Sequence, residues 1–173
     1  LFGDGAGAVV LQDREDVGYE GIAGMDLHAD GSLGDILMRP AGGSAMPITE
    51  EILEMGKQYT EMDGPALFKV AVRRMGEAAQ HTLEKAGLEP ADIDWVVPHQ
   101  ANLRIIEAIK ERLDVPDEKV VINVDEYGNT SAASVGLALD EAYRDGRIQS
   151  GDTVLMVAFG AGLTWAGCVV RYP

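Results

Sequence analysis

The sequence is poor in cysteine and in basic residues, and it has no long apolar run. A single cysteine, Cys168, excludes an internal disulfide and offers no spacing typical of a zinc or iron–sulfur site. No apolar stretch approaches the roughly 20 residues that span a bilayer, and no charged-then-apolar leader opens the sequence. Only 14 basic residues stand against 29 acidic ones, and a net charge of −15 argues against nucleic acid as a partner. These shortages favour a soluble, cytoplasmic protein.

The 173 residues have an ordinary apolar content, enough for one compact core. Two glycine-rich segments resemble each other, GAGAVVL at residues 5–11 and the stretch at residues 159–170, because in each a glycine turn runs into small and β-branched residues. The first reads as a strand already under way. The pair predicts a duplicated unit and a chain that begins inside a longer protein, with chance similarity as the alternative.

Between these segments, the apolar spacing predicts strands that alternate with helices. The clearest helix covers residues 65–86, because apolar residues recur there at helical spacing between Pro65, suited to a first turn, and Gly87, suited to a helix end. The other expected segments are helices at residues 50–55, 100–113 and 131–144 and strands at residues 21–27, 59–62, 93–97, 119–124, 153–159 and 164–171. This order predicts an α/β fold with a mixed, mainly parallel sheet, helices on both faces and an antiparallel last strand.

In such sheets, functional groups gather beyond the carboxyl ends of the strands. His99 lies at one such end and near the start of a predicted helix, whose dipole favours the neutral form of the imidazole. A neutral imidazole can donate one hydrogen bond to an oxygen that gains charge during a reaction. The alternative is a structural histidine.

Two further segments follow strands in the same way. Asn129 offers an uncharged amide donor, or serves only as a turn or cap residue beside Gly128. The glycine turn at residues 159–162 either opens backbone N–H groups to an oxyanion or forms a simple hairpin. No catalytic triad, metal-ligand cluster or nucleotide-binding loop has usable spacing, and His28 and His81 are expected in solvent.

Two motifs carry a resemblance to a known family. PHQANLRII at residues 98–106 and GNTSAAS at residues 128–134 resemble the initiating ketoacyl synthases, the synthase III family of the thiolase superfamily. Shorter matches follow in the same order, and they are LFGDGAGA at residues 1–8, LFKVAV at residues 67–72, DGRI at residues 145–148 and residues 159–165. The resemblance covers nearly the whole chain.

This resemblance implies one half of a duplicated thiolase-like fold. Residues 1–15 would be the last strand of a preceding half and residues 16–173 the C-terminal domain. In the family, a cysteine of the first half takes an acyl group from acyl-CoA, and malonyl-acyl-carrier protein then loses carbon dioxide and attacks it. His99 and Asn129 match the donors to the malonyl thioester oxygen. No cofactor is implied beyond these substrates, and the full-length protein is expected to be a homodimer.

The resemblance also implies roles around these donors. Ala161 matches the backbone oxyanion donor for the acyl-cysteine, although the family often has glycine there, and Phe159 matches the wall between cysteine and histidine. Residues that match the pantetheine tunnel are Asn102, Gly64 and Phe68. Residues that match the surface for the acidic carrier protein are Lys69 and Arg104, with Arg73 as a third basic side chain near them, and a positive patch would steer such a partner.

Cys168 does not fit the nucleophile, because it lies within the expected last strand and has no neighbouring base or helix N-terminus that would lower its pKa. The alternatives to an acyltransferase are a non-catalytic partner that binds carrier protein, and a relative that condenses other acyl groups in secondary metabolism. A cysteine at the start of an upstream helix would distinguish the acyltransferase from the non-catalytic partner. The relative that condenses other acyl groups stays open, because the acyl pocket is expected largely upstream.

The first prediction concerns the 173-residue chain on its own. It should make no acetoacetyl-carrier protein from acetyl-CoA and malonyl-carrier protein, because it has no cysteine suited to hold the acyl group. Mass spectrometry of the carrier protein measures the product. Formation of that product by the purified chain would contradict the prediction.

Overall fold

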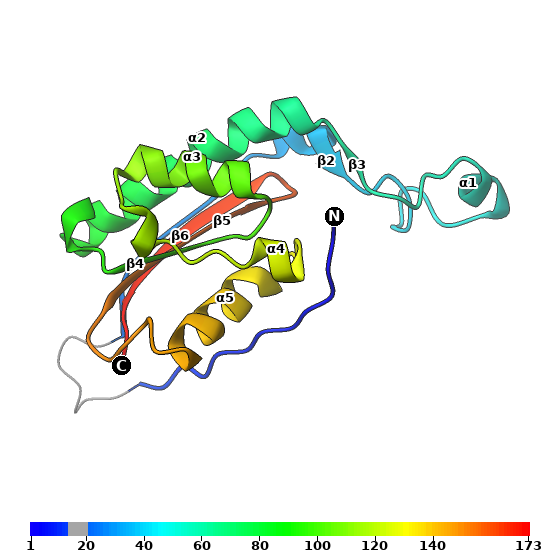
Figure 1. Ribbon diagram of the computed structural model, residues 1–173. Coiled ribbons are helices and arrows are strands. Elements are labelled where there is room, and N and C mark those ends of the chain that lie inside the picture. Colours follow the sequence, from blue (N-terminus) through cyan, green and yellow to red (C-terminus); the bar gives the residue numbers. More distant parts are fainter. Residues whose placement is uncertain (14–20) are drawn as a thin grey trace.

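The computed structural model describes residues 1–13 and 21–173, which form a four-stranded sheet with helices on both faces (Figure 1). The strand order is β1–β6–β5–β4, with bounds Gly21–Ala29, Thr164–Arg171, Thr153–Gly160 and Trp95–Pro98. β5 is parallel to β4 and antiparallel to β6, and β6 is antiparallel to β1. Three strands of this sheet therefore share one direction and the last strand is reversed, which confirms the predicted fold class.

Helices α2 (Gly64–Ala86) and α3 (Leu103–Leu113) cover one face of the sheet, and α5 (Ala133–Arg144) covers the other (Figure 1). The bounds of α2 follow the sequence, because the Asp63 side chain accepts from the Ala66 N–H at 3.1 Å and Gly87 ends the helix in the left-handed region at φ 69°. The predicted helix at residues 65–86 is thus confirmed.

The core has two layers because β5 is buried on both faces. Leu155 and Val157 pack on the α2 and α3 side, whereas Val154 packs on the α5 side. This alternation explains why β5 reads as a nearly continuous apolar run. On the face covered by α2, this helix packs directly on β6 at Gly167. A Cβ added at Gly167 would lie 2.9 Å from the Ala78 carbonyl oxygen, so the close packing needs a glycine there.

Smaller elements surround this core. The chain between β1 and α2 leaves the sheet, and Figure 1 shows α1 away from it. Its elements are a 3-10 helix at Gly31–Ile36, β2 at Leu37–Met38, α1 at Glu50–Glu54 and β3 at Glu61–Met62. The remaining ones are 3-10 helices at Pro90–Asp92 and Asp117–Lys119, and α4 at Val124–Tyr127. Within the described residues, no helix combines the length and the apolar content that crossing a membrane requires.

The predicted strand at residues 119–124 is wrong. Contact with the sheet there is limited to a single parallel bridge between Val120 and Val96 and a bond of 2.9 Å from the Val121 N–H to the Val96 carbonyl oxygen, and α4 begins at Val124. The reason is that the Asn123 N–H donates to the Gln100 side-chain oxygen at 3.0 Å, so the chain turns away from the sheet after Val121. The helix expected at residues 100–113 also begins later, at Leu103, because Asn102 is its N-cap.

Residues 1–13 form no strand, apart from an isolated bridge between Phe2 and Asn129. They run along α5 instead (Figure 1), and Gly7 lies so close to Gly136 that an added Cβ would be 3.4 Å from its Cα. A strand needs a partner, and no described segment pairs with residues 5–11. Their assignment to a preceding half therefore stays a prediction, and its boundary at residues 15 and 16 lies outside the described residues.

Candidate active site

The three segments selected by the strand-end rule meet at one cavity of about 750 Å³. His99 follows β4, Phe159 to Ala161 cover the end of β5, and Asn129 precedes α5, and all of them line this cavity. Parallel strands β4 and β5 bring their carboxyl ends to the same edge of the sheet, which explains why His99 meets residues 159–161. Asn129 reaches the cavity from α4 (Val124–Tyr127) and not from a strand end.

His99 is held by its backbone and by its ring. Its N–H donates to the Val157 carbonyl oxygen at 2.8 Å, and its Nδ1 lies 2.6 Å from the Ser134 hydroxyl oxygen. Burial lowers the pKa of His99 below its ordinary value, so the imidazole is neutral at physiological pH. The helix expected directly after His99, α3, begins only at Leu103, and the cause that the structure supports for the lowered pKa is burial.

Asn129 is held on both sides of its peptide unit. Its N–H donates to the Leu1 carbonyl oxygen and its own carbonyl oxygen accepts from the Gly3 N–H, both at 3.0 Å. The side-chain Oδ1 accepts from the Ser131 N–H at 2.9 Å, which fixes the orientation of the amide. The Nδ2 hydrogens are then the donors that Asn129 can offer to a ligand in the cavity.

A buried glutamine joins the two donor segments. Gln100 Nε2 donates to the carbonyl oxygens of Pro98 at 2.9 Å and of Val121 at 3.0 Å, and its Oε1 accepts from the Asn123 N–H. The bond to Pro98 lies within the segment that carries His99. The bonds to Val121 and Asn123 connect this segment with the one that leads to Asn129. Gln100 belongs to the PHQANLRII motif, but its residue type alone predicted no role for it.

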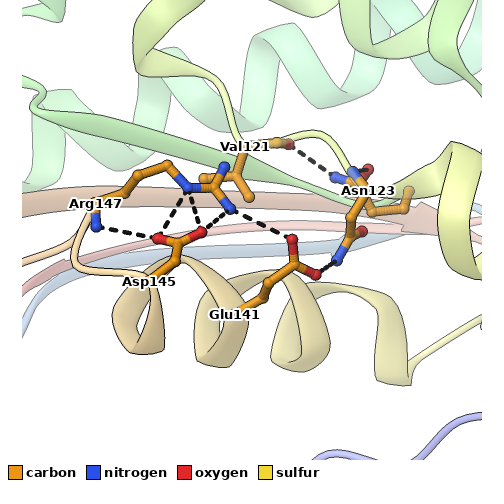
Figure 2. Close-up of polar contacts among 6 residues, drawn as sticks. Val121, Asn123, Glu141, Asp145 and Arg147 are labelled. Carbon is orange, nitrogen blue, oxygen red and sulfur yellow. Dashed lines mark hydrogen bonds and ion pairs between the residues drawn. The ribbon is translucent and has the colours of Figure 1, made fainter.

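Figure 2 shows how this connection continues to α5. Asn123 Nδ2 donates to Glu141 Oε2 at 3.0 Å, and Glu141 Oε1 lies 3.4 Å from a guanidinium nitrogen of Arg147. Arg147 also pairs with Asp145 at 2.6 Å, and this hydrogen-bonded pair lowers the pKa of the Asp145 carboxyl. The start of α4 is thereby anchored to α5, so that the loop carrying Asn129 is held between two tied helices.

Comparisons with known proteins identify the family of the chain. The family model described as 3-oxoacyl-[acyl-carrier-protein (ACP)] synthase III C terminal matches residues 83–172. The chain belongs to this family. It is 55% identical over 172 residues to beta-ketoacyl-[acyl-carrier-protein] synthase III of Caldanaerobacter subterraneus subsp. tengcongensis, with 99% of the chain and 51% of the relative covered. For the Roseiflexus sp. (strain RS-1) protein of the same name, the identity is 53% over 99% of the chain and 52% of the relative.

Solved synthase III structures share the fold. The Aquifex aeolicus VF5 enzyme aligns with a TM-score of 0.79 at 42% identity, covering 92% of this chain and 46% of that one. For the Thermus thermophilus enzyme, the TM-score is 0.79 at 45% identity, covering 94% and 48%. The prediction of one half of a thiolase-like fold is thus confirmed. The chain spans about half the length of the curated relatives it matches.

The other residues that the synthase III resemblance selected lie in or beside the cavity. Phe159, Ala161 and Asn102 line it, and Asn102 also caps α3, since its Oδ1 accepts from the Ile105 N–H at 3.0 Å. Gly64 and Phe68 do not line it, although both lie in the first turns of α2 next to Leu67, which does. These five roles are not tested by the geometry and stay predictions.

The residues of the predicted basic surface lie on α2 and α3. Lys69 and Arg73 are exposed and four residues apart on α2, so they share a helix face. Arg104, at the start of α3, lies with its guanidinium carbon 5.6 Å from the centre of the Phe68 ring. Arg73 also approaches Glu77 at 4.0 Å, a weak surface pair that leaves most of its charge exposed.

Cys168 lies in β6, opposite Met25 and Met156 in the neighbouring strands. Burial raises the pKa of its thiol, so the sulfur stays protonated and is a poor nucleophile. The structure thus agrees with a packing role for this cysteine.

One group of described side chains has the composition of a metal site, Asp26 with His28 and His81. Both histidines are exposed, as predicted, but they also contact a buried group, because His28 Nε2 is 2.6 Å and His81 Nδ1 is 3.4 Å from the Asp26 carboxylate. Lys85 already binds the other carboxylate oxygen at 2.6 Å. Its positive charge and the short His28 contact oppose a bound cation, so the group is organised as an ion-pair cluster between β1 and α2.

The second prediction concerns this cluster. Burial by itself raises the pKa of Asp26, but hydrogen bonds from Lys85 and His28 outweigh it, so the pKa lies below its ordinary value. A lowered carboxyl pKa stabilises the fold above the ordinary pKa, and this contribution is lost as pH falls through the lowered one. Lys85→Met should therefore reduce the free energy of unfolding at pH 7 by about 1 kcal/mol, a modest value because Lys85 is half exposed.

Urea unfolding of the complete protein at pH 7 and in acid measures this difference, which should shrink as Asp26 is protonated. Lys57→Met is the matched control, because it breaks the exposed pair of Lys57 with Glu61. An equal loss of stability in both variants at pH 7, or a loss that grows in acid, would contradict the prediction.

Proposed function

We propose that this chain provides the decarboxylation half of a β-ketoacyl-acyl-carrier-protein synthase III, which condenses acyl-CoA with malonyl-acyl-carrier protein to begin fatty-acid synthesis. The observation that carries the proposal is that His99 and Asn129, two neutral donors from different segments, line the same cavity. Family membership supports it. The expected homodimer and cytoplasmic location stay predictions.

The chemistry requires such donors. When the malonyl thioester loses carbon dioxide, the electron pair of the broken C–C bond moves toward the thioester oxygen, which gains negative charge. The imidazole of His99 and the amide of Asn129 can each donate a hydrogen bond to that oxygen without first losing a proton. A preorganised donor of this kind lowers a barrier by about 3–4 kcal/mol.

The carbanion then attacks the acyl carbonyl held on a cysteine that this chain does not contribute. A new C–C bond forms, and the cysteine sulfur leaves with the electrons of the broken thioester bond. In the proposal, the Ala161 N–H stabilises the oxygen of that acyl carbonyl and Phe159 forms the wall beside it. Asn102, Gly64 and Phe68 border the entry for pantetheine.

A basic surface would bring the carrier protein to this entry. Lys69, Arg73 and Arg104 form it, and Arg104 lies against Phe68 beside the cavity-lining segments. In a chain with a net charge of −15, a local positive patch is needed to attract an acidic partner. The proposal therefore assigns these three residues to docking and not to chemistry.

The third prediction tests the donors in the complete protein. His99→Ala and Asn129→Ala should each lower the rate of carbon dioxide release from malonyl-carrier protein by about 10²–10³-fold, the loss typical of one oxyanion donor. Cys168→Ala, in the same sheet but outside the cavity lining, should leave the rate unchanged. Full activity of both donor variants would favour the alternative, a non-catalytic domain that binds carrier protein.

The fourth prediction tests the docking surface. Lys69→Glu and Arg104→Glu should each raise the KM for malonyl-carrier protein by roughly tenfold at low salt, with little change in kcat, because a reversed surface charge weakens encounter and not chemistry. Lys110→Glu, farther along α3, is the matched charge reversal and should have a small effect. Equal KM values for all variants at low and high salt would rule the surface out.

A further inference from the structure

We propose that Ser134 is a positioning residue that sets the tautomer of His99, by donating its hydroxyl hydrogen to Nδ1 and so placing the imidazole hydrogen on Nε2. The inference rests on the proposed function of His99 as a neutral donor. It concerns a residue that lies outside the cavity lining and would act only through its neighbour.

The hydrogen-bond count at Ser134 decides the direction of the bond. Its hydroxyl is buried and has one hydrogen and two lone pairs. The Gln100 N–H can only donate, and at 3.3 Å it takes one lone pair. The sole other bond of this hydroxyl among the described residues is the 2.6 Å contact with His99 Nδ1.

Two arrangements of that contact are possible, and they differ in cost. If Nδ1 carried the hydrogen and donated it, the serine hydroxyl would have its own hydrogen left without an acceptor inside the protein, which is unfavourable. If the hydroxyl donates, each group finds a partner. Nδ1 is then the acceptor and Nε2 carries the hydrogen of the neutral ring.

The tautomer matters because the proposed chemistry needs a donor. With the hydrogen on Nε2, the ring can bond the thioester oxygen as it gains charge. With the hydrogen on Nδ1, the ring would present a lone pair to that oxygen and repel it. The wrong tautomer would thus turn a stabilising group into an opposing one.

Residues at the start of α5 hold the side chain of Asn129 in a similar way. The Ser131 N–H binds the amide oxygen of Asn129, just before α5, and the Ser134 hydroxyl binds Nδ1 of His99 from the first turn of α5. In both cases, a serine at the start of α5 donates a hydrogen bond to the acceptor atom of the side chain. The donor atom, Nδ2 of Asn129 or Nε2 of His99, is then available to a ligand in the cavity. The start of α5 thereby orients both side chains so that each presents a hydrogen-bond donor to the cavity.

The experiment uses the complete protein with ¹⁵N-labelled histidine. In the wild type, the ¹⁵N shifts of His99 should show a hydrogen on Nε2 and none on Nδ1. Ser134→Ala should give a mixture of tautomers and lower the kcat for carbon dioxide release by about 10–100-fold, with little change in KM, a loss typical of removing a supporting hydrogen bond. Ser134→Thr, which keeps the hydroxyl, should restore most of both readouts.

Thr82→Val is the matched control, because it removes a buried hydroxyl that has no hydrogen-bond partner among the described residues and lies outside the cavity lining. It should change neither the His99 shifts nor kcat. A wild-type His99 with its hydrogen on Nδ1 would overturn the inference even if Ser134→Ala fails to fold. So would a Ser134→Ala variant that keeps the Nε2 hydrogen and loses less than threefold in kcat.

The two proposals fail in different ways. If His99→Ala leaves decarboxylation unchanged, the proposed function fails, whatever the tautomer. If His99→Ala abolishes decarboxylation while Ser134→Ala matches the wild type in rate and in ¹⁵N shifts, the inference about Ser134 alone fails.

Discussion

The arrangement of the site depends on the buried amide of Gln100. Its three hydrogen bonds tie the end of β4 to the segment between Val121 and Asn123, and each would leave a buried backbone group unsatisfied if the glutamine were lost. Because of these bonds, the chain leaves the sheet after Val121, enters α4 and reaches Asn129 from a fixed direction. The ion-paired network of Glu141 and Arg147 then holds α4 against α5 (Figure 2).

Much of the fold could be predicted from apolar spacing and end signals. α2 had a helical stripe between Pro65 and Gly87, and β5 and β6 had strand composition on both sides of a glycine turn. The segment at residues 119–124 misled the prediction because its composition suits a strand. Its backbone N–H at Asn123 is taken by a side chain from elsewhere in the chain, and residue type does not encode that exchange.

The main residues of the candidate site could also be predicted from the sequence, but not the contacts between them. The strand-end rule located His99 and the glycine turn, whereas it selected Asn129 as the end of a strand that does not form. The family resemblance gave His99 and Asn129 their expected roles. Ser134 stood within the quoted GNTSAAS motif, yet its contact with His99 depends on how α5 crosses β4. The signal was present only as a serine near the predicted helix start, which ordinarily indicates a cap. The cluster around Asp26 was missed for the same reason, since it joins β1 to the far end of α2.

The backbone bonds that Asn129 makes with Leu1 and Gly3 carry a consequence for folding order. They join residues that are separated by most of the chain's length, whereas the contact of Ser134 with His99 spans 35 residues and that of Ser131 with Asn129 spans two. Long-range closures form late because the intervening chain must first lose its freedom. Helix α5 can therefore form before Asn129 makes its backbone hydrogen bonds with Leu1 and Gly3. The side-chain amide of Asn129 is then fixed in place only in the last stage of folding.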